Sequence, residues 1–177
     1  MKKYILYLFA MTIGLVGLSS CSEEASEEEE YANWKERNEQ FLASLVNDSL
    51  KQQNWQRIKL FSLDPTTEGA ASDYIYVKKI TNGEGTETPI FTDSVRVVYQ
   101  GRLLPSKYYP KGYVFDGTVY GEYSPVTAYT KRQAVSNTIL GYATALQNMH
   151  KGDYWRVYIP SELGYGTSDY STIPGYS

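Results

Sequence analysis

Few side chains in this sequence can do chemistry. Asp116 is the one acid in a run of apolar and aromatic residues, "GYVFDGT", and the other acids after residue 72 are scattered. The chain has one cysteine, Cys21, and one histidine, His150, which excludes a disulfide framework and a zinc site of these residues. No nucleophile lies beside a base. What remains is one aspartate, aromatic faces, and the hydroxyls of 18 tyrosines.

One reaction needs no more than this set. Rotation about an Xaa–Pro bond requires no acid, base, nucleophile or metal, because its barrier of ~18–20 kcal/mol is the amide resonance lost on twisting. An apolar pocket around the proline ring favours the twisted amide, which is less dipolar than the planar one. A hydroxyl or backbone N–H can bind a flanking carbonyl. The residues are therefore compatible with prolyl isomerisation without a cofactor or metal.

The elements that must position these groups follow from the apolar spacing. Helical spacing predicts a helix over about residues 34–50 and favours a second short helix within 51–63. From residue 73, strand patterns occur in "DYIYVKKI", "SVRVVYQGRLL" and "DYWRVYIP", with a short strand over 114–116. The segment "SNTILGYATALQNMHKG" predicts a helix. The fold class is α+β, with an antiparallel sheet and one helix packed on it.

Four segments match one known family. "VRVVYQGRL", "GYVFDGT", "NTILGYATALQNMHKGD" and "VYIPSELGYG…STIPG" resemble the strand, Phe-Asp motif, helix and flap of the FKBP-type peptidyl-prolyl isomerases. They follow the family's order at compatible spacing and cover about half the chain. The resemblance implies an FKBP-like antiparallel sheet with one helix across it, preceded here by a helical segment. That segment would either dimerise or pack on the sheet.

The resemblance also implies roles for residues of the first three motifs. Tyr99 would line a proline pocket and donate its hydroxyl toward Asp116, and Phe115 would form a wall. Asp116 would orient polar groups without titrating. Thr138 and Ile139 would begin the helix, where the Ile139 backbone N–H could bind a substrate carbonyl.

The remaining implied roles belong to the helix and the C-terminal loop. Tyr142 would be the pocket floor, where the family commonly has tryptophan. Tyr165 would supply the flap hydroxyl, and Ile173 the apolar tip of the flap. Without the family pattern, Asp116 reads as a turn residue. Three others then read as ordinary core residues: Phe115, Ile139 and Tyr142.

The sequence departs from the family in two places. Lys131 and Gln133 stand where the family usually has aromatic residues, and Tyr129 would replace them only in a shifted register. One wall of the pocket would then be polar or open. The family also continues after "IPG" with a final strand in the middle of its sheet, whereas this sequence ends at Ser177. The expectation is a C-terminally incomplete domain with two unpaired strand edges, or one that takes a strand from a partner.

The N-terminus predicts export. "MKKYILYLFAMTIGLVGLSSC" has a positive start, an apolar middle and small residues before Cys21, and its end resembles a bacterial lipobox. Its apolar run, 5–18, is somewhat short for a membrane span of ~20 residues. Six of the 20 acidic residues follow in "SEEASEEEE", which resembles the surface-export signal of Bacteroidota lipoproteins or is a solvated spacer. The rest is nearly neutral, so no nucleic-acid partner is expected.

Together these patterns predict a lipid-anchored isomerase of the outer membrane, on its periplasmic face or at the cell surface. Its partners would be proline-containing segments of exported proteins. The alternative is a non-catalytic FKBP-like module that holds a peptide or partner, and a third reading is a degenerate product. The predicted organisation is a lipoprotein signal peptide (1–20), an acidic tether (21–33), a helical segment (34–63), a linker (64–72) and an isomerase domain (73–177).

Overall fold

Three antiparallel sheets carry the strands of the computed structural model, which describes residues 29–124 and 126–177. The predicted signal peptide, Cys21 and most of the acidic tether lie outside these residues. Within the described part, no helix has both the length and the apolar composition that crossing a membrane requires. Residues Asn33–Ser177 form one compact unit, so the 34–63 segment belongs with the strands that follow it.

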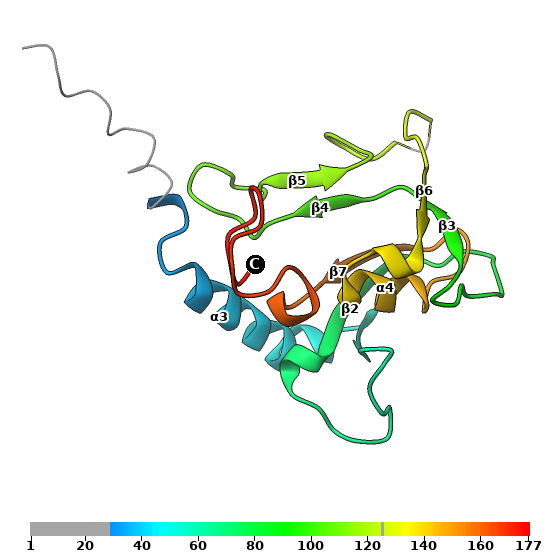
Figure 1. Cartoon of the computed structure of the whole chain (residues 1–177), viewed down its shortest axis with the longest axis horizontal. Helices are drawn as coiled ribbons and strands as arrows, with labels where there is room; N and C mark the ends of the chain where they lie inside the picture. Colours follow the sequence, from blue (N-terminus) through cyan, green and yellow to red (C-terminus); the bar gives the residue numbers. More distant parts are fainter. Residues whose placement is uncertain (1–28, 125) are drawn as a thin grey trace, which may run out of the picture. The chain divides into compact units, whose positions relative to one another are not determined.

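The elements follow one another along the chain as helices, 3-10 turns and short strands (Figure 1). They are α3 (Trp34–Asn47), η1 (Ser49–Lys51), β1 (Trp55–Lys59), η2 (Ala71–Asp73), β2 (Tyr74–Thr81), β3 (Ser94–Val97), β4 (Gln100–Arg102), β5 (Val114–Gly117), β6 (Lys131–Ala134), η3 (Val135–Asn137), α4 (Leu140–Leu146), β7 (Tyr154–Tyr158) and η4 (Ser161–Leu163).

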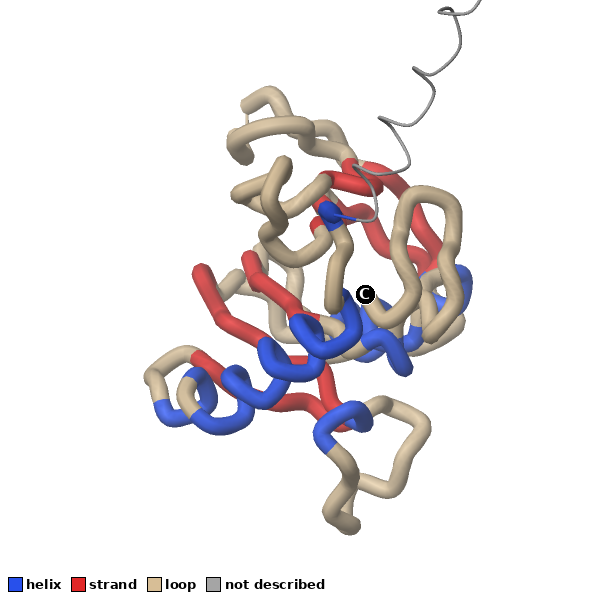
Figure 2. The backbone as a smooth tube through the Cα atoms, turned by 90° about the vertical axis from the view of Figure 1, so that its left-hand side faces the viewer, coloured by secondary structure: helices blue, strands red, loops and turns tan. Residues whose placement is uncertain are grey.

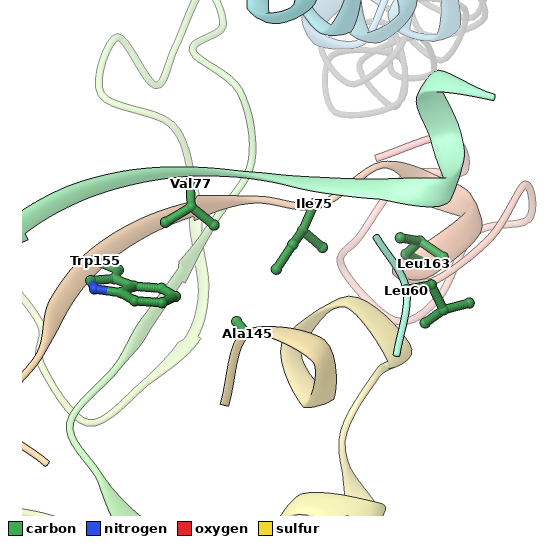
Figure 3. Close-up of a cluster of buried hydrophobic side chains, with 6 residues drawn as sticks. All are labelled: Leu60, Ile75, Val77, Ala145, Trp155 and Leu163. Atoms are coloured by element: carbon green, nitrogen blue, oxygen red, sulfur yellow. The ribbon is translucent and has the colours of Figure 1, made fainter. Parts of the chain in front are cut away.

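Strand β2 is the centre of the largest sheet, whose order is β1-β2-β7. Its side chains alternate between two faces, as the strand period requires. Ile75 and Val77 point toward α4 and pack with Ala145 and Trp155, as Figure 3 shows. Tyr76 lies on the opposite face with residues of α3, including the buried Leu45. The sheet is therefore covered on both faces.

The long helix α3 packs on this sheet, one of the two alternatives that the sequence leaves open. Phe41 of α3 contacts Tyr158 of β7, with ring centroids 5.4 Å apart. Figure 2 shows α3 as the long helix in front of the red strands. Its first residue, Trp34, donates from Nε1 to the Ser177 hydroxyl at 2.8 Å. The helix therefore also holds the C-terminal loop.

The predicted second helix within 51–63 is wrong, because residues 55–59 form strand β1. This strand pairs antiparallel with β2 along its full length, from Trp55 opposite Lys78 to Lys59 opposite Tyr74. The apolar residues at 55, 58 and 61 fit helical spacing by themselves. Pairing with a neighbouring strand overrides that local pattern, and only the folded chain supplies the neighbour.

The other two sheets are two-stranded, β3-β6 and β4-β5. The predicted single strand "SVRVVYQGRLL" is thus split in two, because the chain leaves the first ladder at Val98 and Tyr99. There the Tyr99 N–H donates to the Thr118 hydroxyl at 3.1 Å, and the Thr118 N–H donates to the Tyr99 carbonyl at 2.9 Å. This break between β3 and β4 changes the direction of the chain at Tyr99, whose ring lines the cavity described below.

Strands β3, β4 and β7 each have one paired edge in the described part of the chain. Residues of all three line a cavity of about 2270 Å³ between the sheets. Strands β1, β5 and β6 also have one paired edge each in this part of the chain. An open edge is therefore common to all described strands except β2, and the expectation that a missing final strand leaves two edges unpaired stays a prediction.

Candidate functional site

All eight sequence-predicted pocket residues line this one cavity, although they come from four segments of the chain. They are Tyr99, Phe115, Asp116, Thr138, Ile139, Tyr142, Tyr165 and Ile173. The strands β4 and β5, the start of α4 and the loop after β7 bring them together. The site is therefore a property of the fold and not of any single motif.

A hydrogen-bonded row of three polar groups lies at the site. The Tyr99 hydroxyl donates to Asp116 Oδ2 at 2.7 Å, as the resemblance implies. The other carboxylate oxygen, Oδ1, accepts from the Gly117 N–H at 2.8 Å. On the opposite side, the Lys131 ammonium donates to the Tyr99 hydroxyl oxygen at 3.2 Å. Tyr99 thus links a cation to an anion.

Aromatic rings form the apolar part of the site. Phe115 and Tyr165 meet edge to face, with centroids 5.7 Å apart and planes at 87°. Tyr142, on α4, contacts Tyr99 at 5.8 Å. Tyr165 in turn stacks on Tyr170 at 5.2 Å. Tyr170 was not predicted as a site residue, and its place in the same tyrosine-rich loop as Tyr165 is the signal that could have found it.

Strand β4 makes room for the Phe115 ring because a glycine, Gly101, lies against it. A Cβ on Gly101 would lie 2.6 Å from Cζ of Phe115, which is closer than non-bonded carbons approach. Gly101 is also the strand partner of Asp116. One glycine therefore positions both members of the Phe-Asp motif.

The start of α4 lies where the prediction put it. Ile139 is the residue before the helix, and its carbonyl accepts from the Ala143 N–H at 2.9 Å. Thr138 donates its hydroxyl to the Val135 carbonyl at 2.9 Å, which fixes the turn into the helix. The Ile139 N–H makes no hydrogen bond within the described residues, as is normal in the first turn of a helix. Its role toward a substrate stays a prediction.

The C-terminal part of the chain, which contains the whole candidate site, matches a known family. Residues 85–177, just over half of the chain, match the family described as FKBP-type peptidyl-prolyl cis-trans isomerase. The chain belongs to this family. All eight pocket residues fall within the matched range.

Two curated proteins with sequences similar to this chain agree with the family match. The macrophage infectivity potentiator of Trypanosoma cruzi is 35% identical over 104 residues, which are 56% of this chain and 45% of the relative. The peptidyl-prolyl cis-trans isomerase Mip of Coxiella burnetii is 35% identical over 89 residues, 50% of this chain and 33% of the relative. The chain thus spans less than half the length of either protein.

A solved structure supports the fold. The peptidyl-prolyl cis-trans isomerase of Pseudomonas syringae pv. tomato superposes with a TM-score of 0.55, at 22% identity. The match covers 82% of this chain and 86% of that one. The FKBP-like architecture, with its antiparallel sheet, one crossing helix and an added N-terminal helix, is therefore confirmed.

The FKBP flap differs in one detail from the prediction. Ile173 was expected at the apolar tip, but Tyr170 and Ile173 exchange both backbone hydrogen bonds, each 2.9 Å long. The tip is therefore made of Ser171 and Thr172. Ile173 follows the turn and is only 5% exposed. A β-bridge closes the loop so tightly that the apolar residue lies inside the loop and faces the cavity.

The departure from the FKBP pattern at Lys131 and Gln133 is present in the structure. Lys131 and Gln133 of β6 lie opposite Val97 and Val95, and alternation puts their side chains on one face. Tyr129 is 61% exposed and lies outside the strand, so it does not replace them. The Gln133 side-chain oxygen is buried and accepts no hydrogen bond from the described residues. This wall of the site is polar.

The tyrosine hydroxyls of the site stay protonated across the physiological range. Burial raises the pKa of Tyr142, and the nearby Tyr99 and Asp116 raise it further. Burial, then the charge of Asp116, raise the pKa of Tyr165. Burial and the hydrogen bond to Asp116 raise the pKa of Tyr99, against the smaller effect of Lys131. The site therefore offers neutral hydroxyl donors beside the Asp116 carboxyl group and the Lys131 ammonium.

Proposed function

We propose that this chain catalyses cis–trans isomerisation of Xaa–Pro bonds in polypeptides, the reaction after which its family is named. The observation that carries the proposal is the aromatic pocket around the hydrogen-bonded Tyr99 and Asp116. The C. burnetii relative supports it, because it is named as a peptidyl-prolyl cis-trans isomerase and is 35% identical over 50% of this chain.

The residues of the pocket suit the physical demands of the reaction. The proline ring would lie between Phe115, Tyr142 and Tyr165, where apolar surroundings favour the twisted amide over the more dipolar planar one. The neutral Tyr165 hydroxyl and the Ile139 N–H would bind carbonyls on either side of the proline. Asp116 accepts from Tyr99 and so fixes that ring against Tyr142. No proton needs to move in this mechanism.

The decisive test is cis–trans exchange of a short Phe-Pro peptide, measured by NMR with the purified protein. The uncatalysed exchange takes about 10–100 s, so acceleration is easily detected. We expect catalysis, and we expect Tyr165→Phe to lower the rate by roughly two- to tenfold, the contribution of one net hydrogen bond. A folded protein that leaves the exchange rate unchanged would falsify the proposal.

A non-catalytic FKBP-like binding module remains the second candidate, and the polar wall at Lys131 and Gln133 is the observation that favours it. It would use the same aromatic cavity to hold an extended peptide. The two candidates separate when binding and turnover are measured on one peptide. Binding seen by chemical-shift changes, together with unaccelerated exchange, would select the module.

We further propose that the protein is exported and lipid-anchored at the outer membrane, as a folding helper of the Bacteroidota lipoprotein type. The support is the signal-peptide pattern over residues 1–21, which ends with a lipobox-like Cys21, and the acidic run after it. Acyl chains would contribute ~0.8 kcal/mol for each buried CH2 group. The test is mass spectrometry of the mature N-terminus with detergent partitioning. The Cys21→Ser variant should lack the mass of the lipid and move to the aqueous phase. The Ser20→Ala variant should keep the lipid mass and stay in the detergent phase.

A further inference from the structure

Lys131 occupies the edge of the site with a donor to spare. Its ammonium donates to the Tyr99 hydroxyl at 3.2 Å and lies 5.5 Å from the centre of the same ring. Its side chain is exposed at the start of β6. An ammonium has three N–H donors, so one contact with Tyr99 leaves two directed to solvent or to a bound molecule.

The two charges of the site are not equally satisfied. Each oxygen of Asp116 already accepts a hydrogen bond, from Tyr99 and from the Gly117 backbone. Lys131, in contrast, has no carboxylate within 4.0 Å among the described residues. The hydrogen bond to Tyr99, with the charge of Asp116 beyond it, raises the pKa of Lys131 and keeps it protonated. In the described part of the chain, Lys131 therefore still lacks a partner of opposite charge in direct contact.

We propose that Lys131 makes this site prefer polypeptides that carry an acidic side chain directly before or directly after the proline. The inference rests on the proposed function, because Tyr99 must line the pocket that holds the proline ring. The Lys131 nitrogen is 3.2 Å from the Tyr99 hydroxyl, and one extended residue advances a chain by ~3.3–3.6 Å. A carboxylate on a residue next to the proline therefore reaches the ammonium. An aromatic residue at this position would give no such preference.

The test compares peptides that differ only in the residue before or after the proline, with Glu, Gln or Lys at that place. Exchange rate and affinity are both measured, by NMR. At one of the two places we expect the Glu peptide to exceed the Lys peptide by about two- to fivefold in kcat/KM, the range for exposed charge pairs. At 1 M salt the Debye length falls to about 3 Å, so the ratio should fall toward one.

Three variants locate the effect. Lys131→Met should bring the Glu-to-Lys ratio close to one, and Lys131→Glu should invert it. The matched control is Arg132→Met, which removes the same charge from the next residue of β6, where alternation turns the side chain to the other face. It should keep the wild-type ratio. If Lys131→Met lowers the rate equally for all peptides and keeps the Glu-to-Lys ratio, Lys131 acts only through its packing against Tyr99, and the charge preference is overturned.

Failure of this proposal is distinguishable from failure of the proposed function. Wild-type protein that accelerates all peptides equally, or a ratio that survives in Lys131→Met, overturns the charge preference and leaves the isomerase intact. Arg132→Met losing the ratio as fully as Lys131→Met also overturns it, since the preference would then come from the general field. If no peptide is turned over, the affinity ratio decides, and absence of any binding overturns both proposals.

Discussion

Strand β2 and the strands of the site stand in opposite environments. Four consecutive residues of β2, Tyr74 to Val77, are at most 7% exposed, because α4 covers one face of the strand and α3 the other. Strands β4, β5 and β6 are each half-buried or exposed along most of their length. The comparison teaches that one sheet carries the stability of the unit, while two two-stranded sheets carry groups that must reach another molecule.

The largest expected effect is on the buried side of the comparison. Ile75→Ala removes a side chain that is 0% exposed, so it should lower the free energy of unfolding by about 2–5 kcal/mol. Urea denaturation measures this loss. Ile90→Ala is the matched control, because Ile90 is 63% exposed and its change should stay within about 0.5 kcal/mol. Similar losses in both variants would show that β2 is not the main source of stability.

The next effect separates the site from stability. Asp116→Ala leaves the Tyr99 hydroxyl without its acceptor and Lys131 without the nearby negative charge. We expect the isomerisation rate to fall roughly tenfold, with a change in unfolding free energy below about 1 kcal/mol, since the carboxylate is exposed. Parallel exchange and urea measurements test both statements. A large loss of stability with the rate preserved would contradict the division between the two regions.

A smaller effect should follow from the glycine opposite Phe115. Gly101→Ala places a Cβ against the far end of the Phe115 ring, which must swing away from Tyr165. The lost aromatic contact should weaken binding of a proline peptide by about two- to tenfold. Titration followed by NMR gives the affinity. Gly121→Ala is a control, because a Cβ there meets nothing within 4 Å, although its positive φ makes a small stability change expected.

The smallest effect concerns pH. The pKa of Tyr142 is raised by burial above its usual value near 10, so this group stabilises the fold fully below pH 10. Its contribution is lost as the pH rises from there through the higher folded-state pKa. Activity and thermal stability should therefore be unchanged by tyrosine ionisation between pH 6 and 9, and stability should fall above about pH 10. Tyr142→Phe should flatten that alkaline fall. An inflection in both wild type and variant near neutral pH would point to a different group.

The buried region was easier to predict from the sequence than the exposed one, with one exception. The alternation in "DYIYVKKI" and the apolar spacing before His150 were enough to predict β2 and α4. Strand β1 was missed, because five residues with apolar side chains three apart have no strand signal until β2 lies beside them. The local apolar pattern predicts an element correctly when burial of that element's own side chains decides its structure. It fails when pairing with a neighbouring strand decides the structure.

For the site, the resemblance supplied what physics alone left open. Asp116 reads as a turn residue and Phe115 as a core residue until the four motifs are aligned. The structure then joins Asp116 to Tyr99 by a hydrogen bond and brings the Phe115 ring against Tyr165. The stacking of Tyr170 on Tyr165 and the contact of Lys131 with Tyr99 were not predicted. Both depend on how two separate segments meet, which no spacing within one segment specifies.

The unpaired edges of β3, β4 and β7 have a consequence for handling the protein in solution. An open strand edge is a template that pairs with the edge of another molecule, without regard to its sequence. Charged side chains on such strands, here Arg96 and Arg156, oppose close approach of a second copy. Light scattering should therefore show self-association that grows with protein concentration and with salt, as screening weakens that repulsion. Dilute, low-salt buffer is the condition in which the monomer should persist.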